Sequence, residues 1–332
     1  MEPMVARSHR FFPERLRTGS ETRVTVVPMT SIEVRGLTKR YGPETVVDDL
    51  SFTVEPGQVT GFLGPNGAGK STTMRMITGL ARPTSGTVTI GGRRYGDLPV
   101  PLTEVGALLD AGAVDGHRTA YDHLLALAVS NGIPRRRVGE VLARTGLESV
   151  ARRRTGGFSL GMRQRLGIAA TLLGDPRVLI FDEPVNGLDP EGIRWIRDFM
   201  RSLAADGRAV LVSSHLMSEM AQTADHLVVV GRGRLIADTS MDALVTAGGQ
   251  GEVLVRTPDP SVLRRQLVSA GAAVRDGLES SLIVTGLTSA EIGLLAATHG
   301  TALAELTPQR VSLEDAFMEL TRDSIEFAEV TS

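Results

Sequence analysis

A glycine-rich segment, Gly64 to Ser71, has the residue types and spacing that bind phosphate groups. It reads Gly-Pro-Asn-Gly-Ala-Gly-Lys-Ser and fits the pattern G-x-x-x-x-G-K-[ST] in full. Glycines let consecutive backbone N–H groups turn inward around a phosphate, and the lysine adds a compact, mobile cation. We therefore predict that Lys70 contacts the β- and γ-phosphates of a nucleotide and that the Ser71 hydroxyl binds its Mg²⁺ ion.

The residues on either side of this segment support the prediction. An apolar run, Val59 to Leu63, reads as a short buried strand before it, and Ser71 to Leu80 has helical character after it. The positive end of the helix dipole adds to the attraction for phosphate. A glycine-rich turn that arose by chance would not be expected between a strand and a helix.

Two adjacent carboxylates, Asp182 and Glu183, follow a second apolar run, Val178 to Phe181. Ligands of α/β sheets bind at the carboxyl ends of the strands, which is where this pair lies. Asp182 is placed to hold the Mg²⁺ shell and Glu183 to polarise a water molecule. By itself such a pair also fits a solvated turn; together with the phosphate-binding segment it predicts a hydrolytic nucleotide site.

Strand-like and helical segments alternate as far as residue 247. The predicted segments that follow the carboxylate region are the helix Gly192 to Ala205 and the strand Val210 to Ser213, and the helix Gly161 to Leu173 precedes it. This alternation predicts an α/β domain with a largely parallel sheet at residues 31–247. Residues 1–30 are polar and lack periodicity, which indicates a flexible extension or a translation start near Met29, since Ser31 to Val34 already reads as a first strand.

The pattern changes after Gly248. The predicted elements are a strand at Glu252–Arg256, a helix at Pro260–Gly271, strands at Ala273–Arg275 and Ser281–Thr285, a helix at Ser289–His299, a strand at Ala302–Leu306 and a final helix at Ser312–Arg322. The order β-α-β-β-α-β is that of a small ferredoxin-like α+β unit. We predict an accessory domain at residues 252–325, joined by a glycine-rich linker at residues 248–251.

Composition excludes several classes of protein. The 332 residues are 42% hydrophobic and 22% charged, with a formal net charge of −2, so no global field recruits nucleic acid or anionic lipid. Cysteine is absent, which excludes disulfides and thiolate metal sites. No apolar run approaches the roughly 20 residues of a membrane-spanning helix, and the N-terminus lacks the apolar segment of a signal peptide.

Nucleotide-binding proteins of other kinds are also excluded. A guanine-specific GTPase reads its base with the motif N-K-x-D, but the chain has only two lysines, Lys39 and Lys70, and neither follows asparagine. A small-molecule kinase would hold its acceptor in the same chain and would not need the motifs that come after the phosphate-binding segment.

Over residues 31–240 the chain resembles the ATP-binding cassette (ABC) family. Phe158-Ser159-Leu160-Gly161-Met162 is similar to the family's L-S-G-G-Q signature and lies shortly before the carboxylate strand. Further segments resemble the D-loop (Asn186 to Pro190), the switch-histidine segment (Ser213 to His215) and the aromatic that stacks on adenine (Tyr41). Taken singly, Ser159 also fits a helix N-cap, His215 a polar strand end and Tyr41 a half-exposed strand aromatic.

The resemblance implies a P-loop ABC ATPase domain with a helical subdomain, which forms a head-to-tail dimer around two ATP molecules. Ser159 and Gly161 of one protomer would reach the γ-phosphate held by the partner. Glu183 would be the general base, His215 would sense the γ-phosphate, and Lys70 would be a catalytic cation. The implied nucleotide contacts are Tyr41, Gly64, Pro65, Asn66, Gly67, Ala68, Gly69, Lys70, Ser71, Thr72, Ser159, Gly161 and Asp189. The implied Mg²⁺ ligands are Ser71, Asp182 and Asp110.

Three residues depart from the family pattern. Leu160 replaces a glycine of the signature and Met162 replaces its glutamine, while Asp110 aligns with the Q-loop glutamine. An ionised carboxylate can accept from Mg²⁺-bound water but cannot donate as an amide does. The departures bear on the timing of hydrolysis and its coupling to a partner.

Within the family, the chain is most similar to the drug- and antibiotic-efflux (daunorubicin-resistance-like) exporters. These share a Ser-Leu-Gly-Met signature, an acidic Q-loop residue and a C-terminal extension like Ser312 to Phe317. We therefore expect an ATPase subunit, a homodimer in the cytoplasm at the inner face of the membrane, whose permease is a separate chain. The accessory domain would stabilise the dimer or sense a ligand.

Two other functions fit an isolated cassette. A soluble ABC ATPase acting on nucleic acid or ribosomes would carry tandem cassettes or a long coiled coil, and no basic aromatic surface signature is present, so no nucleic acid is expected. An ATP-binding regulatory module with low turnover would not need the catalytic residues Lys70, Asp182, Glu183 and His215, which are all present.

Overall fold

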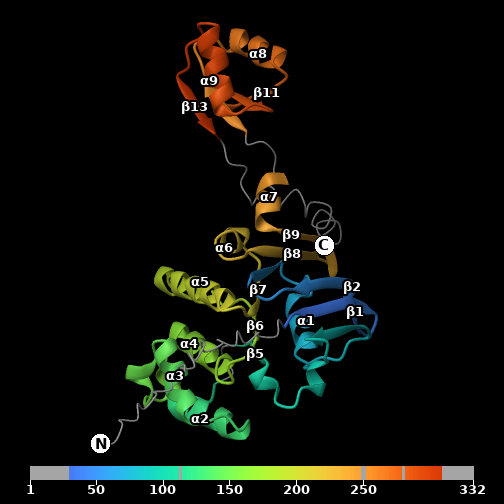
Figure 1. Ribbon diagram of the computed structural model, residues 1–332, viewed down its shortest axis with the longest axis vertical. Helices are drawn as coiled ribbons and strands as arrows, with labels where there is room; N and C mark the ends of the chain where they lie inside the picture. The colour runs from blue at the N-terminus through green and yellow to red at the C-terminus, as the bar shows by residue number, and fades with distance from the viewer. Residues whose placement is uncertain (1–29, 111, 113, 248–251, 279–280, 309–332) are drawn as a thin grey trace, which may run out of the picture.

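The computed structural model describes residues 30–110, 112, 114–247, 252–278 and 281–308 (Figure 1). The predicted extension up to Met29, the linker at 248–251 and the tail helix at 312–322 lie outside the described residues. Within those described ranges, no helix is both long enough and apolar enough to cross a membrane.

A six-stranded sheet forms the centre of the α/β part, in the order β5-β6-β7-β3-β8-β9. Its strands are β3 (Val59–Leu63), β5 (Val105–Leu108), β6 (Val178–Phe181), β7 (Ala209–Ser214), β8 (His226–Gly231) and β9 (Arg234–Ser240). All neighbouring pairs are parallel except β8 with β9. The predicted largely parallel sheet is confirmed, and it brings the carboxyl ends of β3, β6 and β7 side by side.

Successive residues of β6 enter two different hydrophobic cores. Val178 and Ile180 belong to the core that includes the first helix, α1 (Lys70–Ile77), whereas Leu179 and Phe181 belong to the core on the other face of the sheet. Side chains alternate between the faces of a strand, so a strand covered on both faces is apolar at every position. This explains why the run is uninterrupted in the sequence.

A three-stranded antiparallel sheet packs beside α1. It has the order β2-β1-β4, with β1 at Ile32–Tyr41, β2 at Glu44–Val54 and β4 at Ser85–Ile90. The predicted first strand, which begins near Ser31, therefore continues as far as Tyr41. The predicted helix after the phosphate-binding segment ends at Ile77, three residues early, and Gly79 adopts a left-handed φ of 70° just after it.

Three helices, α2 (Ala120–Ser130), α3 (Arg136–Arg144) and α4 (Leu160–Thr171), pack on one another and form the helical subdomain that the family resemblance implies (Figure 1). Three more follow in the chain: α5 (Pro190–Ala205), α6 (Met217–Met220) and α7 (Met241–Ala247). Side-chain caps start α4 and α5, because Ser159 accepts the N–H of Met162 and Asp189 accepts that of Gly192.

The C-terminal elements form a separate antiparallel sheet in the order β11-β12-β10-β13. They are β10 (Val253–Arg256), α8 (Pro260–Ser269), β11 (Ala273–Asp276), β12 (Leu282–Thr285), α9 (Ser289–Thr298) and β13 (Glu305–Pro308). The predicted order of elements and the ferredoxin-like topology are confirmed. The last strand begins three residues later than predicted, because its pairing partner β10 meets Glu305 to Pro308.

Gly106 of β5 allows the end of α4 to lie directly against the central sheet. A Cβ atom at this position would lie 2.2 Å from the carbonyl oxygen of Thr171. Because backbone cannot retreat from that contact without moving the helix, Gly106→Ala is expected to destabilise the fold by about 1–3 kcal/mol. Denaturant unfolding followed by the fluorescence of Trp195, the chain's single tryptophan, measures this.

Gly139 of α3 provides the matched control. It is exposed and a Cβ there would meet nothing within 4 Å, so Gly139→Ala is expected to stabilise the protein by about 0.5–1 kcal/mol through helix propensity. Equal effects of the two substitutions would contradict the close packing of α4 on β5.

Candidate active site

The glycine-rich segment Gly64 to Ser71 connects β3 to α1 and runs close to neighbouring backbone. Gly69 has a φ of 94°, and a Cβ there would lie 2.7 Å from the carbonyl oxygen of Val46. At Gly64 a Cβ would lie 2.3 Å from the carbonyl oxygen of Val230. Both positions therefore require glycine, and they leave the inner surface of the loop lined by backbone.

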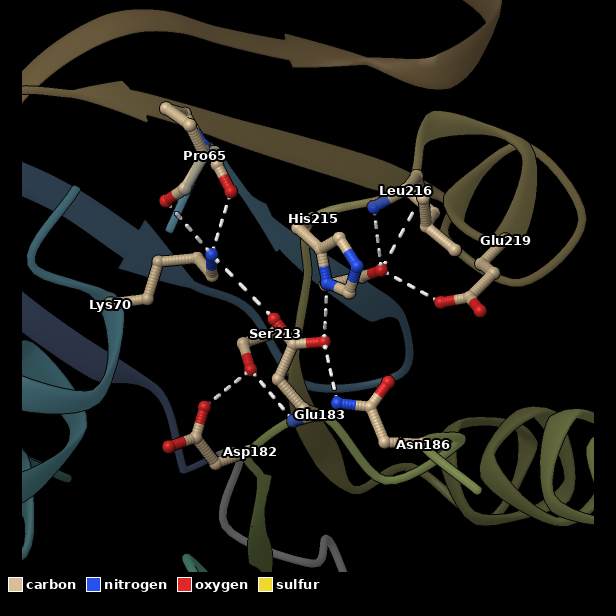
Figure 2. Close-up of polar contacts among 11 residues, drawn as sticks. Pro65, Lys70, Asp182, Glu183, Asn186, Ser213, His215, Leu216 and Glu219 are labelled. Atoms are coloured by element: carbon tan, nitrogen blue, oxygen red, sulfur yellow. Dashed lines mark hydrogen bonds and ion pairs between the residues drawn. The ribbon is translucent and has the colours of Figure 1, made fainter. Parts of the chain in front are cut away.

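Lys70 begins α1 and turns back under the loop. Its ammonium group is buried, with only 6% of the side chain exposed, and it donates to the carbonyl oxygens of Gly64 (2.6 Å) and Pro65 (3.2 Å) (Figure 2). Burial lowers the pKa of Lys70, and the carboxylates of Glu183 and Asp182 only partly offset this effect. A buried cation that is short of counter-charge attracts a phosphate group.

Glu183 lies at the centre of the site, just beyond the end of β6. Its Oε1 is 3.6 Å from the Lys70 ammonium, and its Oε2 is 2.9 Å from Nδ1 of His215 and 3.4 Å from Nδ2 of Asn186 (Figure 2). The side chain is 20% exposed, so water can reach a carboxylate that the protein holds from three sides. This is the arrangement expected of a general base.

Asp182 is oriented by a neighbouring strand. Its Oδ1 accepts a hydrogen bond of 2.6 Å from the Ser213 hydroxyl, and that hydroxyl also accepts the backbone N–H of Glu183 at 2.8 Å. The two acidic residues are therefore linked through one buried serine of β7 (Figure 2).

A cavity of about 280 Å³ opens beside these groups. It is lined by Val46, Asn66, Gly67, Ala68, Gly69, Lys70, Ser71, Thr72, Glu183, Asn186 and His215. Most of the predicted nucleotide contacts are thus brought together with Glu183 and His215. Glu183 and His215 line this cavity together with the residues of the glycine-rich loop.

The residues beside the cavity fit a magnesium ion. Mg²⁺ usually binds through one or two carboxylates, with water and substrate phosphates completing its shell. The Ser71 hydroxyl lines the cavity, and Asp182 directly precedes the lining residue Glu183, so these two side chains could supply such a sparse donor set.

The signature residues lie in a second, separate hollow. Ser159 and Gly161 line it together with Asp189 and the aromatic ring of Trp195. The N-cap role of Ser159 is confirmed, because its hydroxyl accepts the N–H of Met162 at 3.2 Å. Leu160, the substituted signature residue, packs on the D-loop, since a Cβ on Gly187 would lie 2.1 Å from its Cδ2.

Tyr41 and Asp110 are not among the residues that line the cavity. Tyr41 ends β1 with 52% of its surface exposed, and the Lys39 ammonium lies 4.7 Å from its ring centroid. Asp110 is exposed, and its Oδ1 accepts the N–H of Gly112 at 2.7 Å. Within a single chain, both residues have local partners that account for their conformations.

Sequence reasoning missed the roles of Ser213 and Asn186, although both fall inside quoted motifs. One signal could have identified Ser213: it is a serine near the end of an apolar run, and parallel strands of this kind end at the same edge of a sheet. Asn186 carries no comparable signal, since its contact with Glu183 depends on how the D-loop turns.

Comparisons with known proteins agree with the geometry. A family model described as ABC transporter matches residues 47–186, and a model described as a domain of unknown function matches residues 251–314. A solved structure described as the ATP-binding subunit of an ABC transporter has a TM-score of 0.59 at 31% identity, covering 64% of this chain and 91% of that one.

Three curated proteins illustrate the similarity. An uncharacterized ABC transporter ATP-binding protein (YhcH) of Bacillus subtilis is 43% identical over 62% of this chain and 69% of its own length. The bacitracin transport ATP-binding protein BcrA of Bacillus licheniformis is 41% identical over 65% of this chain and 71% of its own. The Nod factor export ATP-binding protein I of Burkholderia lata is 33% identical over 89% of this chain and 98% of its own.

The backbone of Glu183 has a left-handed φ of 49°, which is unfavourable for a residue with a Cβ. Glu183→Gly and Glu183→Ala both remove the carboxylate, but only glycine adopts this conformation freely. We expect the glycine variant to be more stable than the alanine variant by about 1 kcal/mol, measured by denaturant unfolding. At an ordinary position alanine is favoured by about 0.4–1 kcal/mol, so an alanine variant of equal or higher stability would contradict the strain.

Proposed function

The chain belongs to the ABC transporter ATP-binding family, whose members are ATPases coupled to transport, and from this we propose that it powers an exporter of a drug, an antibiotic or a lipid-like compound. The observation that carries the proposal is the position of Glu183, between Lys70 and His215 beside the phosphate-binding loop. Relatives named for bacitracin transport and Nod factor export support the choice of cargo class.

The residues of the cavity divide into binding and catalytic roles. The N–H groups of the loop and the Lys70 ammonium would hold the β- and γ-phosphates of ATP. Ser71 and Asp182 would hold Mg²⁺, which neutralises phosphate charge when bound. Glu183 would take a proton from the attacking water, and His215, whose Nδ1 contacts its Oε2, would keep that carboxylate turned toward the γ-phosphate.

We further propose that the complete site forms only in a dimer. In one chain the signature hollow, with Ser159 and Gly161, is separate from the cavity that contains Lys70. A head-to-tail pair would place each hollow over the partner's cavity. Hydrolysis would then require the two protomers to meet, which ties the chemistry to a large movement.

A separate membrane permease is the partner of this family's ATP-binding subunits. No helix in the described ranges could itself span the bilayer. We propose that a homodimer of the chain binds the permease at the inner face of the cell membrane, and that Asp110, exposed beside β5, takes the place of the Q-loop glutamine in this coupling.

The C-terminal part is proposed as an accessory domain at residues 252–325 that stabilises the dimer. Its described elements have a hydrophobic core of their own, which includes Val255, Leu267 and Val284. A unit with its own core can be removed without opening the ATPase core.

Replacing the proposed base tests the function directly. Glu183→Gln keeps the shape of the side chain but cannot accept a proton, so turnover of ATP is expected to fall by about 100-fold or more. With ATP and Mg²⁺ present, size-exclusion chromatography is expected to show an accumulated dimer. Lys70→Ala serves as the control, because it should lose nucleotide binding and therefore not dimerise on addition of ATP.

Hydrolysis by the Glu183→Gln variant at the native rate would show that another group is the base. A variant that hydrolyses slowly but stays monomeric with ATP would instead contradict the composite site.

Deletion of the residues after Gly248 tests the accessory domain. We expect ATP binding by the monomer to stay within about twofold of the full chain, because that site lies wholly in the preceding residues, whereas the dimer should dissociate at higher protein concentration. Equilibrium binding of a fluorescent ATP analogue and analytical ultracentrifugation measure the two properties separately. Unchanged dimerisation would leave ligand sensing as the role of the domain.

A further inference from the structure

We propose that Ser213 is a positioning residue of the ATPase site, whose hydroxyl holds both the Asp182 side chain and the Glu183 backbone in their working orientations. The inference rests on the proposed function and assigns a role to Ser213, which the family resemblance includes only as a neighbour of His215. It follows from where Ser213 lies in the sheet and from the two hydrogen bonds that it makes (Figure 2).

The position of Ser213 is determined by the parallel sheet. In the pairing of β6 with β7, Phe181 lies opposite Val212, and on the other side of β7, Phe62 of β3 lies opposite Ser213. The next residue of the β6 segment, Asp182, is therefore beside Ser213. No surface of the serine is exposed to solvent, so its hydroxyl must find partners within the protein.

In its two hydrogen bonds the Ser213 hydroxyl acts once as a donor and once as an acceptor. A serine hydroxyl has one hydrogen to donate and lone pairs that accept. Ser213 donates to Oδ1 of Asp182 at 2.6 Å and accepts the N–H of Glu183 at 2.8 Å. A hydrogen bond to a carboxylate is stronger than one between neutral groups, so the donated bond orients the hydroxyl and thereby aligns the accepted one.

Each bond has a separate consequence. The accepted bond satisfies the N–H of Glu183 where that residue takes its unfavourable φ of 49°, and this turn directs its carboxylate toward Lys70 and His215. The donated bond occupies Oδ1 of Asp182 and leaves Oδ2, to which the described residues donate no hydrogen bond, for Mg²⁺. Losing the hydroxyl would thus disturb the base and the metal ligand together.

The neighbouring hydroxyls show that this arrangement is specific. Ser214 donates to Oε2 of Glu219 at 2.7 Å and accepts the N–H of Leu216, so it shapes the turn after His215 and does not contact the acidic pair. Thr60 of β3 is also fully buried in the sheet, but its hydroxyl has no hydrogen-bond partner among the residues that the structure describes. Thr60→Val therefore removes a buried hydroxyl from the same sheet without touching the site.

The experiment compares Ser213→Ala with Thr60→Val in the full-length chain. ATP affinity is measured in EDTA and again over a Mg²⁺ titration, and steady-state turnover is measured at saturating Mg²⁺. Loss of a hydrogen bond to a charged group corresponds to about a 10- to 100-fold change, so Ser213→Ala should lower kcat and raise the half-saturating Mg²⁺ concentration by at least about tenfold. The ATP affinity in EDTA should stay within about twofold of the native value for both variants. Thr60→Val should also leave kcat and the half-saturating Mg²⁺ concentration within about twofold of their native values.

Several results would overturn the inference. It is wrong if Ser213→Ala keeps the native kcat and Mg²⁺ dependence, or if Thr60→Val reproduces its defects, since a general loss of packing would then explain them. If Ser213→Ala melts at a much lower temperature than Thr60→Val, the Ser213→Thr variant is measured as well. When this variant melts at the native temperature, it must also show the native Mg²⁺ dependence, because it keeps a hydroxyl at position 213. Failure of the unsubstituted chain to bind ATP at any Mg²⁺ concentration would instead contradict the proposed function.

Discussion

The proposed active site depends on the sharing of one carboxylate, that of Glu183, between a buried lysine and a histidine. The three residues come from segments far apart in the sequence, which follow or end at the strands β3, β6 and β7. These strands are neighbours in a parallel sheet, so their carboxyl ends lie at the same edge. This arrangement by itself brings the three residues close together.

The sequence predicts most of the elements that are buried on both faces, because strands in such positions are mainly apolar and form short uninterrupted runs. β3 and β6 have the predicted bounds for this reason. Elements with an exposed side were predicted less well: β1 runs on to Tyr41, and β13 is shifted by its pairing with β10. The sequence proposes the phosphate contacts because that chemistry calls for glycine and lysine at a definite spacing, whereas the hydrogen bond of Ser213 to Asp182 is a contact between strands that no local pattern records.

Helix α4, which begins with the signature residues, contacts the loop that follows Glu183 at two points. The buried side chain of Gln164, on the signature helix α4, donates to the carbonyl oxygen of Pro184 at 2.8 Å, immediately after Glu183. Leu160 at the start of the same helix rests on Gly187. Helix α4 thus contacts the loop after the proposed base through a hydrogen bond at one point and through steric contact at another, and the substituted residue Leu160 forms the second of these contacts.

The end of β7 has a consequence for how the chain can diverge in evolution. Ser213, Ser214 and His215 are consecutive, and neighbouring side chains of a strand point to opposite faces of its sheet. Inserting or deleting one residue within β7 would exchange the two hydroxyls and turn the histidine away, even though every side chain needed for the chemistry were still present. Surface loops can change length without this effect, but the register of β7 relative to β6 matters to the proposed site as much as any one of its residues does.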